Sequence, residues 1–226
     1  MAMIWIIFGV FALISWLVGQ QLRSKFRAFS KIPVSYGMTG REVAEKMLRD
    51  NDIHDVQVVS VRGELTDHYN PAKKTVNLSE AVYNTNSVAA AAVAAHECGH
   101  ALQHAHAYSW LKMRSTLVPV VSITSRWVQW VLLAGILMVQ TFPQLLLAGI
   151  VMFGLMTLFS LITLPVEINA TNRALAWLNN SGITTEQTHP KAQEALRWAA
   201  YTYVVAALAS LATLFYYIMI FMGRRE

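Results

Sequence analysis

The chain has 226 residues, of which 55% are hydrophobic and only 14% are charged, and its formal net charge is +5. A composition this apolar excludes an ordinary soluble domain and is typical of an integral membrane protein. The single cysteine excludes an internal disulfide. Much of the positive charge lies beside apolar runs, which indicates membrane anchoring, and we expect no nucleic-acid partner.

Four apolar runs are long enough to cross a bilayer, whose hydrocarbon core needs about 20 apolar residues per helix. They comprise residues 2–19, 116–139, 144–166 and 201–222. The second run contains Arg126, so we expect either a shorter span that begins near Trp127 or an arginine that faces protein or headgroups. The positive charges beside the first run follow it, which favours an uncleaved anchor over a signal peptide.

These runs divide the chain into five segments. We expect a transmembrane anchor at 1–19, a small α+β domain at 20–115, a transmembrane helical hairpin at 116–166, a helical polar segment at 167–200, and a transmembrane helix with a basic tail at 201–226. The fold class is therefore an α-helical membrane protein with about four transmembrane helices and one small α+β domain.

The pattern in the first polar segment predicts a helix followed by short strands. Residues 39–50 are amphipathic, and Thr39 is a candidate N-cap. A β-branched stretch at 55–61 predicts a strand. Two more strands are predicted near 65–69 and 75–78, with a turn between them.

A second helix is predicted over 87–107, which contains the motif AAHECGH. His96 and His100 are four residues apart, so a helix places both imidazoles on one face, where they can bind one metal ion. Glu97 lies about 100° round the helix and can act as a general base on a water molecule. Zinc lowers the pKa of such a water to about 7, which supplies a nucleophile at neutral pH. The motif therefore predicts one zinc ion and a catalytic Glu97.

A third protein ligand is needed, and the candidates are His104, His106 and Glu167. His104 lies one turn beyond His100, where its simpler role is a polar end of the helix near the membrane. His106 has the spacing of the pattern H-E-x-x-H-x-x-G-x-x-H, but Gln103 occupies the position where that pattern needs a glycine. On a continuous helix His106 points away from the metal. Glu167 is the better candidate, because two histidines and a glutamate are a common catalytic zinc set. It follows the third apolar run, and we expect Pro165 to open a helix there.

Three stretches resemble the YugP-like putative neutral zinc metallopeptidases of bacterial membranes: DHYNPAKKTVNLSEAVY at 67–83, AVAAHECGHALQHA at 92–105 and LPVEINATNRALAWL at 164–178. The resemblance covers nearly the whole chain. The order of hairpin, H-E-x-x-H helix and glutamate-bearing helix also resembles the gluzincin core. It implies a gluzincin-like peptidase domain with zinc bound by His96, His100 and Glu167, and with Glu97 catalytic.

The sequence departs from the gluzincin pattern at one position. Gluzincins typically carry an aspartate four residues after the ligand glutamate, where it hydrogen-bonds a zinc-binding histidine. Thr171 occupies that position here, and Asn169 and Asn172 are nearby polar alternatives. An oxyanion donor is also needed. The candidates are Tyr69, His68, Arg173 and Tyr108.

A peptidase can hold an extended substrate as a further strand on an exposed sheet edge. The stretch 74–78, with Thr75, Val76 and Asn77, is our candidate edge because its hairpin immediately precedes the metal helix. The alternative is an ordinary structural strand. Cys98 is expected to pack as a small apolar residue.

These features predict a membrane-anchored zinc metalloendopeptidase that hydrolyses membrane or membrane-proximal polypeptides, with a role in protein quality control. Two alternatives remain open. One is an intramembrane zinc protease whose metal helix lies in the bilayer. The other is a non-enzymatic scaffold whose structural zinc site is closed by four protein ligands. The expected partners are a polypeptide substrate and the lipid bilayer, and a regulatory membrane partner or a homo-oligomer is left open.

The predicted location is a bacterial inner membrane, crossed several times by the chain. Two spans, an even number, separate His100 from Glu167, so both lie on one membrane face. Lysine and arginine residues are concentrated on that face, for example Arg23 and Lys25 after the first span. The positive-inside rule therefore predicts a cytoplasmic active site.

Overall fold

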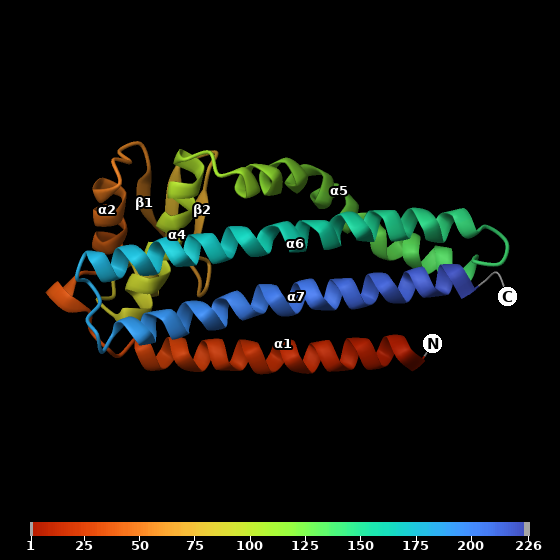
Figure 1. The fold of residues 1–226 in the computed structure, drawn as a ribbon, viewed down its shortest axis with the longest axis horizontal. Helices are drawn as coiled ribbons and strands as arrows, with labels where there is room; N and C mark the ends of the chain where they lie inside the picture. The colour runs from red at the N-terminus through yellow and green to blue at the C-terminus, as the bar shows by residue number, and fades with distance from the viewer. Residues whose placement is uncertain (1, 224–226) are drawn as a thin grey trace. The chain divides into compact units, whose positions relative to one another are not determined.

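The computed structural model describes residues 2–223, which are mostly helical and include a small three-stranded sheet (Figure 1). The long helices of this part of the chain are α1 (Ala2–Phe29), α5 (Ser109–Leu137), α6 (Pro143–Asn180) and α7 (His189–Gly223). These four are long and apolar enough to cross a membrane, in agreement with the four apolar runs. The predicted basic tail, Arg224 and Arg225, lies outside the described residues.

The chain divides into two compact units. One unit contains residues 2–17, 112–164 and 202–223, all from the long helices and their connections. In this unit α5 and α6 pack around a buried cluster of Val128, Leu132, Leu146 and Ile150. Arg126 is exposed on α5.

The second unit, residues 18–111 and 165–201, contains the sheet, the shorter helices and all the candidate site residues. Its sheet consists of β1 (Gln57–Val61), β2 (His68–Asn70) and β3 (Thr75–Ser79). The strand order is β1-β3-β2, with β3 parallel to β1 and antiparallel to β2.

β3 is therefore the central strand, and the prediction that residues 74–78 form an exposed edge is wrong. Thr75, Val76 and Asn77 are paired with strands on both sides. Val76 is fully buried, and Asn77 is only 9% exposed. The edge strands are β1 and β2. The error arises because the parallel pairing of β1 with β3 is a long-range contact, which the local residue pattern does not specify.

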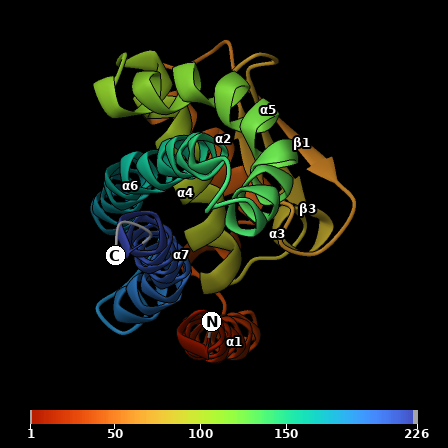
Figure 2. The same cartoon turned by 90° about the vertical axis from the view of Figure 1, so that its right-hand side faces the viewer.

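The shorter helices pack around α4 (Val88–Ala105), the helix that carries the motif. α2 (Gly40–Asp50) begins with a capping box at Thr39, as predicted, and buries Val43 and Met47. The 3₁₀ turn η1 (Ser35–Gly37) and the single-turn helix α3 (Glu80–Tyr83) complete the unit. Figure 2 shows α4 between the second half of α6 and the sheet.

α6 is continuous through the position where we expected a helix to begin. Pro165 lies inside it, so the prediction that this proline opens a new helix is wrong. A proline in a helix interior costs about 3 kcal/mol. The residues that flank Pro165 in the sequence are buried, namely Ile162 and Thr163 before it and Val166 after it. Their burial stabilises the helix and offsets this cost.

Candidate metal centre

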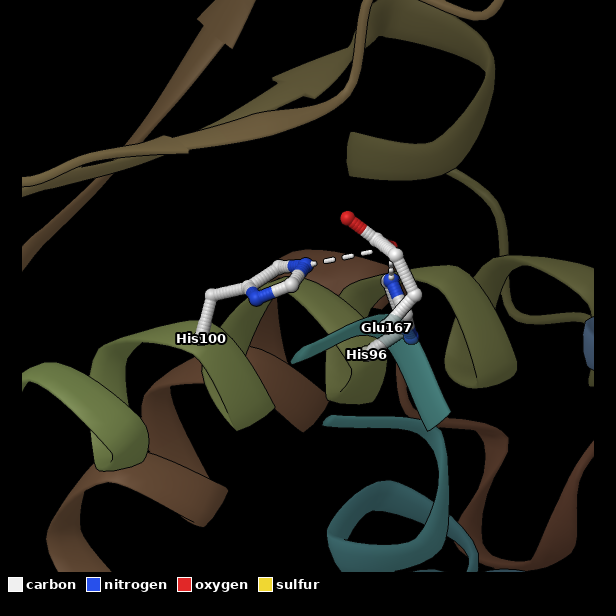
Figure 3. Close-up of side chains that lie close together, drawn as sticks. All are labelled: His96, His100 and Glu167. Carbon is white, nitrogen blue, oxygen red and sulfur yellow. Dashed lines mark ion pairs between the residues drawn. The ribbon is translucent and has the colours of Figure 1, made fainter. Parts of the chain in front are cut away.

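Two helices bring three metal-ligating side chains together: His96 and His100 on α4, and Glu167 on α6 (Figure 3). The Oε2 atom of Glu167 lies 3.3 Å from Nε2 of His96 and 3.5 Å from Nε2 of His100. The imidazole rings meet edge to face, with their centroids 4.8 Å apart. One ligand atom from each residue lies within 4.8 Å of the others.

The three residues fit a zinc ion by donor type, spacing and burial. Two atoms bound to one tetrahedral zinc ion at about 2.0–2.1 Å lie about 3.3 Å apart, and imidazole nitrogen and carboxylate oxygen are ligands that zinc prefers. Both distances to Glu167 are close to this separation. Glu167 is 3% exposed and His100 is 8% exposed. The group could therefore hold a metal ion.

The backbones of α4 and α6 approach each other closely at Gly99. A Cβ atom at Gly99 would lie 2.6 Å from the carbonyl oxygen of Ala170, which is closer than real Cβ contacts. The absence of a side chain lets the two backbones meet. Glu167 is one turn before Ala170, so this approach brings its carboxylate to the histidines.

The second half of α6 has one regularly buried face, which includes Ala170. Every fourth residue of its second half is fully buried: Val166, Ala170, Ala174 and Leu178. The spacing follows from the helical repeat, which returns a side chain to the same face after about four residues. Glu167 lies beside this face and is nearly as buried. The carboxylate is therefore held by a packed helix.

Each imidazole is also contacted at its second ring nitrogen. Nδ1 of His96 lies 3.2 Å from Oγ1 of Thr171, and Nδ1 of His100 lies 3.0 Å from Oε1 of Gln103. Such contacts orient a metal-binding histidine. Thr171 is thus placed as an outer partner of His96, at the position where gluzincins typically carry an aspartate.

Sequence reasoning missed the contact of Gln103. In the sequence, Gln103 is informative only because it stands where a turn toward His106 would need a glycine. Its spacing of three residues from His100 nevertheless places both side chains on one helix face. His106 follows the end of α4 and lies 3.2 Å from Nη1 of Arg173. The metal-ligating group found among the described residues does not include His106.

Glu97 is held beside the metal-ligating group by the backbone of β2. Its Oε2 accepts a hydrogen bond from the N–H of Tyr69 at 3.0 Å, and the residue is 8% exposed. Burial of His100 disfavours its charged form. The hydrogen bond to Glu167 and the charges of Glu97 and Glu167 outweigh that effect and raise the pKa of His100 above its usual value.

The other predicted site residues are dispersed. Asn169 lies in the network beside Gln103, where its Oδ1 accepts from Gln103 Nε2 and Arg173 Nε. The Tyr69 hydroxyl lies 2.8 Å from Nδ1 of His104. Asn172 is exposed on α6. His68 is also exposed, and its Nδ1 lies 2.8 Å from the carbonyl oxygen of Thr66. Tyr108 is half-buried after the end of α4.

Comparison with known proteins agrees with this geometry. Residues 4–222 match a family described as a putative neutral zinc metallopeptidase. A protein of Bacillus subtilis (strain 168) named putative membrane protease YugP is 41% identical over 206 residues, which are 91% of each chain. No solved structure matches the chain. The family description implies zinc as the metal, and by these matches the chain belongs to the family of putative neutral zinc metallopeptidases.

Proposed function

We propose that this protein is a membrane-anchored zinc metalloendopeptidase that cleaves membrane or membrane-proximal polypeptides. The observation that carries the proposal is the position of Glu97, a buried carboxylate beside a group of two histidines and one glutamate. His96, His100 and Glu167 would hold the zinc ion. When bound, zinc supplies a Lewis acid and lowers the pKa of water.

Glu97 is the general base of this proposal. Its carboxylate takes a proton from the attacking water and later passes it to the leaving amine. The hydrogen bond from the Tyr69 N–H holds one carboxylate oxygen in place. A fixed position matters because proton transfer needs the base within hydrogen-bond reach of the water.

The edge strand β2 is the proposed binding place for substrate, in place of β3. β2 is an edge of the sheet, and the N–H of its Tyr69 is directed at Glu97. A strand edge binds an extended peptide through main-chain hydrogen bonds. Glu97 occupies the N–H of Tyr69, so a peptide added to β2 would bond to other main-chain groups of the strand and would pass beside the proposed general base.

Two observations favour this proposal over the alternatives. A structural zinc site is closed by four protein ligands, whereas the metal-ligating group within residues 2–223 contains three. An intramembrane protease would need α4 in the bilayer. α4 is not one of the four helices long and apolar enough to span a membrane, and it contacts α2 and the sheet in the second unit.

Four apolar helices and a relative named a membrane protease support a membrane location. We place the protein in a bacterial inner membrane, with its active site on the cytoplasmic face because lysine and arginine flank the spans on that side. Cleavage of membrane polypeptides at that face suits a role in protein quality control. A regulatory membrane partner and a homo-oligomer are both compatible with this arrangement.

The test is Glu97→Gln in the full chain, purified in detergent. We expect the variant to keep its zinc and to lose cleavage of labelled casein by about 10²–10⁴-fold, because removing a general base costs this much. Glu64→Gln, a change at an exposed position, is the matched control and should cleave normally. A Glu97→Gln protein that cleaves as well as the control would reject the peptidase mechanism. In native membranes, the same variant should retain bound polypeptides that identify the substrate.

A further inference from the structure

Gln103 is a fully buried polar side chain one turn beyond His100 on α4. Its Nε2 donates to the carbonyl oxygen of Val166 at 2.7 Å and to Oδ1 of Asn169 at 3.0 Å. Its Oε1 lies 3.0 Å from Nδ1 of His100. The amide therefore connects one candidate ligand directly with the turn of α6 that carries Glu167.

The orientation of this amide is fixed at Val166. A backbone carbonyl oxygen only accepts hydrogen bonds, so the Gln103 atom that lies 2.7 Å from it must be the NH₂ nitrogen. If the amide were flipped, the Gln103 oxygen would lie 2.7 Å from the Val166 carbonyl oxygen, and neither atom could donate a hydrogen bond. The oxygen of Gln103 must therefore be the atom that faces His100.

Arg173 gives a second, independent constraint. Its guanidinium only donates hydrogen bonds, so the Asn169 atom that lies 2.8 Å from Arg173 Nε must be the oxygen. The same oxygen lies 3.0 Å from the Gln103 amide and therefore requires a donor there as well. Val166 and Arg173 thus fix the same orientation of Gln103 from two sides.

This orientation determines the tautomer of His100. The Gln103 oxygen can only accept, so Nδ1 of His100 must carry the proton, and in a neutral imidazole Nε2 then has the free lone pair. Nε2 is the His100 atom that lies 3.5 Å from Glu167 Oε2. We propose that Gln103 is a positioning residue that holds His100 in the Nδ1–H tautomer and thereby selects Nε2 as its metal-binding atom. This inference rests on the proposed zinc site.

His96 is held in a different way. Its Nδ1 lies 3.2 Å from the Thr171 hydroxyl, and a hydroxyl can either donate or accept. Thr171 therefore orients His96 without selecting its tautomer. This difference supplies a matched control, because each of the two outer partners contacts one imidazole.

The test compares Gln103→Met, which keeps the length of the side chain but removes the amide, with Thr171→Val. The tautomers are read in metal-free protein by NMR of isotopically labelled histidine nitrogens, at alkaline pH where the imidazoles are neutral. All variants carry Glu167→Ala for this measurement, because the Glu167 carboxylate only accepts hydrogen bonds and, 3.5 Å from Nε2 of His100, would itself favour a proton on Nε2 when zinc is absent. The signal of His100 is the one that disappears in His100→Gln. In this background we expect the protein with Gln103 unchanged and the Thr171→Val variant to show His100 protonated at Nδ1, and Gln103→Met to show both tautomers.

Zinc affinity, measured by competition with a chelator, gives a second readout. We expect Gln103→Met to bind zinc about 10–100-fold more weakly than the wild type, the usual effect of losing an outer partner of a ligand. The protein with Gln103 unchanged carries the test should Gln103→Met fail to fold, because the inference already requires its His100 to be protonated at Nδ1.

Two results would overturn the inference. One is a folded Gln103→Met protein in which His100 stays protonated only at Nδ1. The other is a protein with Gln103 unchanged in which His100 carries its proton mainly at Nε2. A wild type that binds zinc but cleaves no polypeptide would instead reject the proposed function and leave the role of Gln103 intact.

Discussion

Gly99 has no side chain to separate α4 from α6, and the close approach of these backbones brings Glu167 to the two histidines. The Cβ atom of an alanine here would lie 2.6 Å from the Ala170 carbonyl oxygen and 3.1 Å from its Cα. These are backbone atoms, which cannot rotate away as the end of a long side chain can. One methyl group at this position should therefore move a candidate ligand.

We predict that Gly99→Ala lowers the free energy of unfolding by about 1–3 kcal/mol, the usual cost of overpacking a tight interior. The variant should also bind zinc more weakly, because α6 must move away from His96 and His100. Chelator competition and denaturant unfolding in detergent measure the two effects. Gly154→Ala, where an added Cβ meets nothing within 4 Å, should leave zinc affinity unchanged and should not destabilise the protein, because alanine favours a helix over glycine. Wild-type zinc affinity in Gly99→Ala would contradict this account of the site.

The sequence predicts some of these residues more readily than others. His96, Glu97 and His100 are found because their relation depends only on the repeat of one helix. Glu167 is predicted from its chemistry and its place in the chain, and the family resemblance supports it. The contributions of Gly99 and Gln103 depend on the packing of α6 against α4. No local pattern reports a contact between residues more than sixty positions apart.

At the scale of the element, α2 supports the helix that carries the motif. Thr39 Oγ1 accepts from the N–H of Glu42 at 3.3 Å, and Glu42 Oε2 accepts from the N–H of Thr39 at 2.7 Å. These bonds satisfy donors at the helix start that would otherwise lack partners. The helix then buries Met47 beside α4.

We predict that Thr39→Ala lowers the free energy of unfolding by about 1 kcal/mol, the typical cost of losing an N-cap. Thr39→Ser keeps the accepting oxygen and should be close to the wild type. Zinc affinity should not change in either variant, because the cap contacts none of the candidate ligands. Denaturant unfolding at neutral pH measures the difference, and equal stability of Thr39→Ala and the wild type would contradict it.

The same capping box predicts a dependence on pH. Hydrogen bonds from the backbone and side chain of Thr39 hold the pKa of Glu42 below its usual value. A group whose folded pKa is lowered contributes stability above its unfolded pKa and loses that contribution as the pH falls through the folded pKa. The difference between Thr39→Ala and the wild type should therefore shrink in acid.

The elements were predicted best where local signals are strong. The cap at Thr39 and the alanine-rich helix follow from residue type and spacing. The continuity of α6 through Pro165 and the central place of β3 do not. Both depend on distant segments, namely the neighbours that bury α6 and the strand β1 that pairs with β3.

At the scale of the whole molecule, the lone cysteine gives a simple means of testing membrane sidedness. Cys98 is fully buried, and its thiol donates to the carbonyl oxygen of Ala44 at 3.6 Å. Burial, reinforced by the charge of Glu97, raises the pKa of this thiol far above its usual value. A thiol that is inaccessible and protonated reacts slowly with maleimides. The native protein should therefore give little background labelling.

We predict opposite labelling of two introduced cysteines, Glu64→Cys between β1 and β2 and Thr141→Cys between α5 and α6. Both positions are exposed. If the chain crosses the membrane at each apolar run, one span separates these positions, and the positive-inside rule places Glu64 in the cytoplasm. In spheroplasts, a membrane-impermeant maleimide should label Thr141→Cys and leave Glu64→Cys unlabelled until the membrane is lysed. The reverse pattern would place the metal centre outside the cell, and labelling of both in intact spheroplasts would show that the chain does not cross the membrane between them.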